Sequence, residues 1–174
     1  MRGSVIGRLL ATCLIFAGLS HAGAAQADFA GRVVHVQDGD TLTVLSSDRR
    51  QIKVRLDGID APERGQPFGN RSTESLRQMC GGQLAHTVDL GTDRYGRTIG
   101  RVNCAGVDVS EEQVRRGMAW VFLRYVAADS PLHGIQGEAS ATRNGLWRDS
   151  SPVAPWDWRA LQRAKKQSAS ARPQ

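Results

Sequence analysis

The sequence predicts a β-rich α+β domain, a five-stranded Greek-key barrel with about three helices at its edges. Short runs of β-forming residues, separated by turn residues, alternate with helical segments in the order βββ-α-ββ-α-(β)-α. The 174 residues, 40% hydrophobic and 23% charged, are enough for one domain of ordinary size. Barrels of this kind commonly bind oligonucleotides.

The strands are expected to be short and to be joined by tight turns. The segment 51–56 alternates with period two, and Asp38-Gly39 is typical of a turn between two β runs. A further turn is expected at 92–97. The predicted strands cover residues 29–36, 41–45, 51–56, 84–90, 98–104 and 107–109, and the apolar run 118–125 is β-like.

Three helices are predicted from apolar spacing and terminal residues. The first covers 70–80 and is closed by Gly81-Gly82. The second opens with a capping box, in which Ser110 is the N-cap and Gln113 reaches back, and it ends at Gly117. The third runs from Ser130-Pro131 to Asn144-Gly145.

Residues 1–27 have the pattern of a signal peptide. Arg2 and Arg8 precede the short apolar run 9–19, and small residues before Asp28 offer a cleavage site. The run is too short for stable membrane insertion, although an uncleaved anchor or a buried N-terminal helix is the alternative. A lipoprotein reading through Cys13 is disfavoured because that residue lies inside the apolar run. We therefore expect an exported protein, periplasmic or secreted.

The remaining chain is moderately basic. The full sequence carries a net charge of +6, and removal of Arg2 and Arg8 leaves 21 basic against 17 acidic residues, or +4. This surplus favours an anionic partner, with nucleic acid ahead of a membrane surface. Residues 28–150 are expected to form the barrel domain, and 151–174 a C-terminal strap, formed around 155–159, with a basic, disordered tail from Lys165.

Two cysteines remain after the first 27 residues are removed. In an exported chain, Cys80 and Cys104 favour one intrachain disulfide, and two independent buried thiols are the alternative. The histidines show no spacing that would suit a zinc site. A disulfide would close a loop containing the turn at 92–97.

Charged residues cluster at three strand ends: Asp38 and Asp40, then Arg55 with the segment 60–63, then the segment 93–97. Two carboxylates brought together can hold a hard divalent cation, and a third can order or deprotonate a water. Two guanidinium groups suit a phosphate that gains charge in the transition state. Together these groups predict phosphodiester hydrolysis.

The combined motifs resemble the thermonuclease, or staphylococcal nuclease-like, family over about residues 30–147. They are Asp-Gly-Asp-Thr at 38–41, Val-Arg-Leu-Asp-Gly-Ile-Asp-Ala-Pro-Glu at 54–63 and Asp-Arg-Tyr-Gly-Arg at 93–97, with support from 114–119 and 144–147. The resemblance implies an OB-fold barrel and a Ca²⁺-dependent endonuclease that acts on DNA and/or RNA and leaves 3′-phosphate ends.

The resemblance also implies roles for individual residues. Asp38 would lie beside the metal, and Glu63 would act as the base or orient the water. The residues carried over are Asp40, Asp60 and the backbone carbonyl of Ala61 as metal ligands, Arg55, Glu63 and Arg97 as catalytic groups, and Tyr95 and Tyr125 as substrate contacts. Leu123 replaces the second tyrosine of the family's nucleotide pocket, which puts base stacking in question.

A catalytically silent OB-fold module that binds nucleic acid is the main alternative to an enzyme. Silent copies typically lack the acids or the arginines, whereas this chain keeps all five side chains: Asp40, Asp60, Glu63, Arg55 and Arg97. A basic protein associated with a cell wall or membrane would rest on charge and the signal peptide alone. We expect a monomeric nuclease, in which the four tryptophans pack rather than stack on bases.

Overall fold

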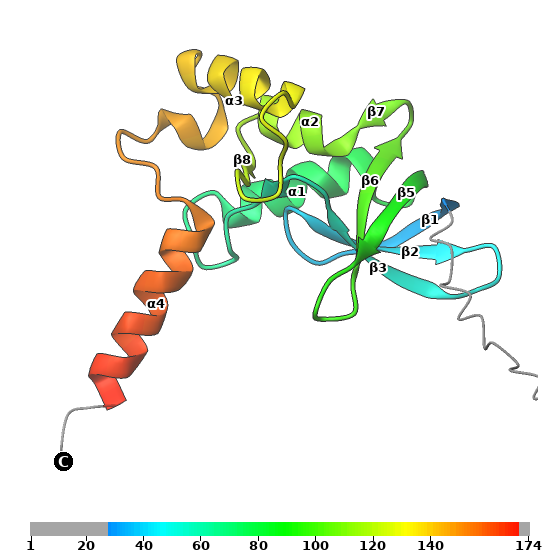
Figure 1. Ribbon diagram of the computed structural model, residues 1–174, viewed down its shortest axis with the longest axis horizontal. Coiled ribbons are helices and arrows are strands. Elements are labelled where there is room, and N and C mark those ends of the chain that lie inside the picture. Colours follow the sequence, from blue (N-terminus) through cyan, green and yellow to red (C-terminus); the bar gives the residue numbers. More distant parts are fainter. Residues whose placement is uncertain (1–27, 171–174) are drawn as a thin grey trace, which may run out of the picture.

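The computed structural model of the protein describes residues 28–170 and contains a closed barrel (Figure 1). The predicted signal peptide at 1–27 and the last four residues of the tail lie outside the described residues. The strands are β1 (Phe29–Val36), β2 (Thr41–Ser46), β3 (Gln51–Leu56), β4 (Ile59–Asp60), β5 (Leu84–Thr92), β6 (Thr98–Cys104), β7 (Val107–Asp108) and β8 (Trp120–Val121).

Five of these strands form the barrel, as predicted. β1 pairs antiparallel with both β2 and β5, β2 pairs with β3, and β5 pairs with β6. The parallel pairing of β3 with β6 then closes the sheet on itself. The interior is filled by aliphatic side chains with almost no exposed area, among them Leu42, Val44, Val54 and Val102. A closed barrel leaves few free strand edges, so it is a rigid base for a site at one end.

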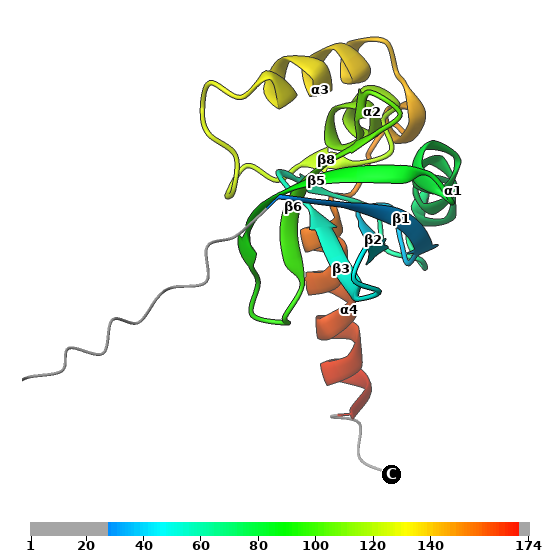
Figure 2. The same cartoon turned by 90° about the vertical axis from the view of Figure 1, so that its right-hand side faces the viewer.

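Within residues 28–170, four α-helices and one short 3₁₀ helix accompany the barrel, which is slightly more than the three helices expected. In Figure 2, α2 and α3 lie over one end of the barrel, α1 lies beside it, and α4 projects away from it. The helices are α1 (Gly69–Cys80), α2 (Val109–Arg115), α3 (Pro131–Ala141), η1 (Gly145–Arg148) and α4 (Pro155–Ser170).

The predicted capping box at the start of α2 is wrong. Asp108 is the N-cap, and its carboxylate accepts a hydrogen bond from the backbone N–H of Glu111. Ser110 instead donates to the carbonyl of Asp57, and Gln113 is completely buried. Both Asp and Ser are good N-cap residues, so the choice depended on which side chain the tertiary structure required elsewhere.

The β-like run predicted at 118–125 is much shorter in the structure. Only Trp120 and Val121 form a strand, β8, which pairs with β4. The partner strand β4 is itself limited to two residues because a turn at Gly58 precedes it and Pro62, which has no backbone N–H, follows it closely. The backbone N–H of Phe122 still donates to the carbonyl of Gly58, and residues 123–125 form a turn and bend.

Residues 165–170 are helical, where the sequence predicted a disordered tail. α4 begins at Pro155 and continues through Lys165 to Ser170. Its residues are mostly good helix formers, with no glycine or proline after Pro155, and Asp157 in the first turn suits the positive end of the helix dipole. Along the last ten residues of α4 only Gln162 is half-buried, and the others are exposed.

The predicted disulfide is confirmed between Cys80 and Cys104, whose Cα atoms lie 5.6 Å apart. It joins the last residue of α1 to the last residue of β6, and both side chains belong to the hydrophobic core. Within residues 28–170, no helix is long and apolar enough to cross a membrane.

Candidate active site

The turn between β1 and β2 is held tightly against two helices. A Cβ atom at Gly39 would lie 1.8 Å from the hydroxyl oxygen of Ser72 on α1, so only glycine fits there. From α2, the buried Gln113 side chain donates a 2.6 Å hydrogen bond to the carbonyl of Gly39. The backbone N–H of Asp40 donates to Asp38 at 3.1 Å. These contacts fix where the Asp40 carboxylate points.

Asp40, Arg55 and Asp60 form a buried cluster at the end of the barrel. The register of β2 and β3 places Thr41 opposite Arg55, so the guanidinium of Arg55 reaches the neighbouring Asp40. Its Nη1 lies 3.2 Å from Asp40 Oδ2, and its Nη2 lies 3.0 Å from Asp60 Oδ1. The Arg55 side chain is only 14% exposed. One arginine thus bridges the two carboxylates that the sequence predicted as metal ligands.

The loop after β4 adds two more of the predicted residues. The backbone N–H of Ala61 donates a 2.7 Å hydrogen bond to Asp40 Oδ2, which joins the first and second motifs. The backbone N–H of Glu63 donates to the side chain of Gln66, and the Glu63 side chain is 44% exposed. Glu63 is therefore accessible to solvent beside a buried pair of carboxylates.

Burial and repulsion from Asp40 raise the pKa values of two carboxylates at this end of the barrel, Asp60 and Asp38. Burial is the main cause that raises the pKa of Asp60 above its ordinary value, and Asp40 adds to it, although Arg159 and Arg55 oppose the shift. Burial and the nearby Asp40 raise the pKa of Asp38 to about 6. Three carboxylates that repel one another, with oxygen donors only, are a suitable environment for a hard cation. No group of three or more His, Cys, Asp or Glu side chains in the described range has the arrangement of a metal cage.

Arg97 approaches the cluster from the turn between β5 and β6. The carboxylate of Asp93 accepts hydrogen bonds from the backbone N–H of Arg97 at 3.0 Å and from the Nε of Arg97 at 2.8 Å. Its Nη1 lies 3.5 Å from the hydroxyl of Thr41, and that hydroxyl donates to Asp40. Thr41, which the sequence analysis did not single out, therefore links the third motif to the first.

The two tyrosines predicted to contact substrate are both exposed but differ in position. Tyr95 is 71% exposed, and the guanidinium groups of Arg94 and Arg97 lie 5.1 and 5.7 Å from its ring centre. Tyr125 is 65% exposed and packs edge-on against Phe122, with ring centres 4.9 Å apart. Tyr95 thus accompanies Arg97, which the sequence predicted as a catalytic group, whereas Tyr125 belongs to an aromatic group near α4.

That aromatic group attaches α4 to the rest of the molecule. The ring of Trp156 stacks on Phe122 at 5.4 Å and meets Trp120 edge-on at 5.9 Å, and Trp120 in turn packs on Trp147. These three tryptophans pack against protein side chains, as the sequence predicted.

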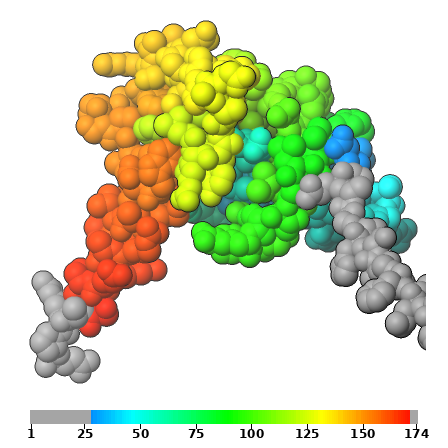
Figure 3. All heavy atoms as spheres, in the orientation of Figure 1, coloured from blue at the N-terminus to red at the C-terminus, as the bar shows by residue number. Residues whose placement is uncertain are grey.

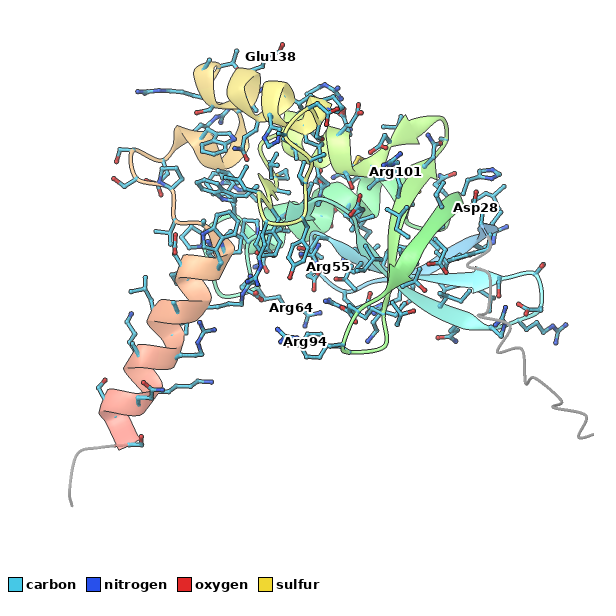
Figure 4. All side chains as sticks on the ribbon, viewed as in Figure 1. Asp28, Arg55, Arg64, Arg94, Arg101 and Glu138 are labelled. Carbon is cyan, nitrogen blue, oxygen red and sulfur yellow. A yellow bond between two sulfur atoms is a disulfide. The ribbon has the colours of Figure 1, made fainter. Side chains whose placement is uncertain are left out.

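Arg159 is the main site residue that sequence reasoning missed. Its Nη2 lies 2.6 Å from Asp60 Oδ2, and its Nη1 lies 3.3 Å from Asp60 Oδ1 and 2.8 Å from Glu63. Burial alone would lower the pKa of Arg159, but the hydrogen bonds to Asp60 and Glu63 outweigh it and raise that pKa. In Figure 4, the labelled Arg55 lies between the barrel and the first turns of α4. The only sequence feature pointing to Arg159 was its place in the predicted strap.

A closed OB-type barrel that presents buried carboxylates, two arginines and an accessible glutamate has the features of a phosphodiester-cleaving enzyme. Comparison with known proteins agrees. The family model described as "Staphylococcal nuclease homologue" matches residues 53–149. An "Uncharacterized endonuclease" of Escherichia coli O157:H7 is 42% identical over 134 residues, which cover 76% of this chain and 86% of the relative.

A "Micrococcal nuclease" of Shigella flexneri is 39% identical over 145 residues, covering 78% of this chain and 83% of the relative. An "Uncharacterized endonuclease" of Haemophilus influenzae is 40% identical over 129 residues, covering 74% and 71%. The chain therefore belongs to the staphylococcal nuclease family, and it is a nuclease.

Proposed function

We propose that this nuclease is an exported, Ca²⁺-dependent endonuclease that hydrolyses DNA and/or RNA and leaves 3′-phosphate ends. The observation that supports this proposal best is the cluster in which Arg55 bridges Asp40 and Asp60, with Glu63 beside it. The name of the Shigella flexneri relative concerns that protein, and it agrees with a nuclease active on nucleic acid.

Asp40, Asp60 and the carbonyl of Ala61 would hold the cation. Both carboxylates are buried, and hard oxygen ligands match Ca²⁺ better than they match zinc. When bound, Ca²⁺ would supply positive charge close to a phosphate oxygen. The carboxylate of Asp38 accepts a hydrogen bond from the backbone N–H of Asp40. Asp38 would therefore orient Asp40 and would not itself be a metal ligand.

Arg55 and Arg97 would bind the scissile phosphate from two sides. Both guanidinium groups are held in place by carboxylates, Arg55 by Asp40 and Asp60 and Arg97 by Asp93. A charge that is already oriented needs no rearrangement as the phosphoryl oxygens gain negative charge, so it stabilises the transition state more than the substrate. Tyr95, next to Arg97, would contact a phosphate of the substrate.

Glu63 would accept a proton from the attacking water or orient that water. Its carboxylate is half exposed and stands beside the cluster, so water can reach it. In-line attack would break the bond between phosphorus and the 5′ oxygen, which leaves the phosphate on the 3′ end. Tyr125 would contact the nucleotide, without the second tyrosine that Leu123 replaces.

The test is digestion of a plasmid and a single-stranded oligonucleotide by the purified protein, with Ca²⁺, with excess chelator and with Zn²⁺ alone. We expect cleavage only with Ca²⁺, and nicked and linear plasmid as early products. The fragments should release inorganic phosphate when they are treated with a 3′-phosphatase. Full activity in chelator or with Zn²⁺ alone would contradict the metal assignment. Fragments carrying 5′-phosphate would contradict the direction of cleavage.

Export has a separate measurement. Expression of the full-length chain with a C-terminal tag, followed by fractionation and mass determination, should yield a mature protein that begins at Asp28 outside the cytoplasm. An intact N-terminus in the cytoplasmic fraction would contradict this part of the proposal.

A further inference from the structure

Near its start, α4 places the guanidinium of Arg159 on Asp60, one of the two carboxylates proposed to bind metal. Asp60 has two oxygen atoms, and Arg159 hydrogen-bonds to both, at 3.3 and 2.6 Å. The same guanidinium takes one oxygen of Glu63 at 2.8 Å. Asp60 Oδ1 is shared with Arg55, so each oxygen of this buried carboxylate already has a cationic partner.

A metal ion and the Arg159 guanidinium need the same oxygen atoms. A hard cation binds carboxylate oxygens directly, at about 2.3–2.6 Å for Ca²⁺. A guanidinium that donates to both oxygens of Asp60 occupies the space that the cation would need. Two positive charges this close to each other in a partly buried site also repel strongly. Binding of one therefore weakens binding of the other.

α4 is attached in a way that lets Arg159 leave. Gln66 donates to the carbonyl of Val153 at 2.6 Å, and Trp156 stacks on Phe122, so the start of the helix is fixed. Beyond Arg159 the helix extends away from the barrel, as Figures 1 and 3 show, and it is mostly exposed up to Ser170. The Arg159 side chain is 37% exposed, against 14% for Arg55. Movement of this side chain would not disturb the core.

We propose that Arg159 is an internal competitor of the metal ion for Asp60, so that α4 sets the cation concentration at which the nuclease becomes active. This inference rests on the proposed metal site at Asp40 and Asp60. At low cation concentration Arg159 neutralises the carboxylates, and at high concentration the metal displaces it. Because coupling between two binding events is reciprocal, bound Ca²⁺ must loosen the contact between α4 and the site to the same degree.

The test compares Ca²⁺ binding by isothermal titration calorimetry for the wild type, Arg159→Gln and Arg163→Gln. Arg163 lies one turn further along α4, is exposed and has no ion-pair partner within residues 28–170, so its substitution removes the same charge without the contact. We expect Arg159→Gln to lower the Kd for Ca²⁺ by about tenfold, equal to about 1.4 kcal/mol. We expect Arg163→Gln to change it by less than about twofold.

A second measurement needs no variant. Amide hydrogen exchange of the wild type, with and without saturating Ca²⁺, should show faster exchange in residues 155–166 when Ca²⁺ is present.

The melting temperature of each variant, followed by circular dichroism, shows whether it folds. If Arg159→Gln does not fold, Arg159→Lys replaces it, and an intermediate decrease in Kd is expected because one ammonium group cannot span both oxygens of Asp60.

The outcomes separate the two proposals. If the wild type binds no Ca²⁺, the proposed metal site fails, and the competition fails with it. If the wild type binds Ca²⁺ but a folded Arg159 variant binds it equally or more weakly, only the competition is overturned. Unchanged or slower exchange in α4 on addition of Ca²⁺ would also overturn it. A lower cleavage rate at saturating Ca²⁺ with an unchanged Kd would show instead that Arg159 acts on the substrate.

Discussion

Two arginines bind the carboxylate of Asp60, and they come from regions built in different ways. Arg55 lies on β3, five residues before Asp60, and is held between two carboxylates at the end of the closed barrel. Arg159 lies on α4, 99 residues after Asp60, on a helix that is attached by Trp156 to aromatic side chains outside the barrel.

The difference shows that the site has a permanent part and a displaceable part. The barrel part depends on the strand register that places Arg55 and on the two carboxylates that hold it, within a barrel that the disulfide joins to α1. The α4 part depends on an aromatic stack and on the ion pairs of Arg159, whose side chain is 37% exposed although its partner Asp60 is buried, so this guanidinium has direct access to solvent. Positioning of a phosphate suits the first part, and adjustment of metal binding suits the second.

The largest expected effect is that of Arg55→Lys on cleavage. A lysine keeps the positive charge, but its single ammonium group cannot bridge Asp40 and Asp60 and present a flat pair of donors to phosphate. We expect kcat to fall by about 10²–10³-fold, the usual cost of losing an oriented charge donor. The measurement is kcat on a single-stranded oligonucleotide at saturating Ca²⁺, together with the melting temperature.

The matched control is Arg101→Lys. Arg101 is exposed on β6 and lies away from Arg55 in Figure 4, so kcat should stay within about twofold. An Arg55→Lys protein that melts normally and cleaves within about threefold of the wild type would show that the barrel arginine does not perform the predicted role.

The next effect concerns the stability of the barrel part. Removal of the disulfide in the double variant Cys80→Ser, Cys104→Ser should lower the free energy of unfolding by about 3 kcal/mol, because the bond spans a sequence separation of 24 residues. Urea unfolding followed by circular dichroism measures it. Activity of the folded variant should persist, since the proposed chemistry uses no thiol.

Reduction of the wild type offers an independent comparison. The reduced wild type and the double variant should share the same lowered urea midpoint. Two free thiols in the denatured, unreduced protein would contradict the presence of the bond, and with it the expected loss of stability.

The smallest effect on stability is expected for Trp156→Ala in α4. Trp156 makes two aromatic pairs, each of which contributes about 0.5–1.5 kcal/mol beyond its buried area, and both lie outside the barrel core. The urea midpoint of the barrel should therefore move less than in the cysteine variant, while faster amide exchange in residues 155–166 reports a loosened helix. Trp158→Ala, also half-buried on α4, is the matched control. A loss of stability as large as that of the cysteine variant would mean that the two parts are not independent.

The sequence by itself determined the barrel and the side chains in its mouth. The strands 51–56 and 98–104 were predicted to the residue, and the motifs around Asp40, Asp60 and Arg97 were recognised before any coordinates. Such features depend on short-range patterns, namely side-chain alternation, turn residues and fixed spacing between polar groups. The distance from Arg55 to Asp60 is five residues, so one turn brings them together.

Only the tertiary structure decided which distant polar groups meet. Gln113 resembles a capping partner of Ser110 along the chain, but packing of α2 on the β1–β2 turn buries it against Gly39. Arg159 resembles any surface arginine of a basic tail, and its partners are Asp60 and Glu63, 99 and 96 residues away. Local sequence cannot specify such pairs, because they exist only after the chain has closed the barrel and brought the start of α4 beside Asp60 and Glu63.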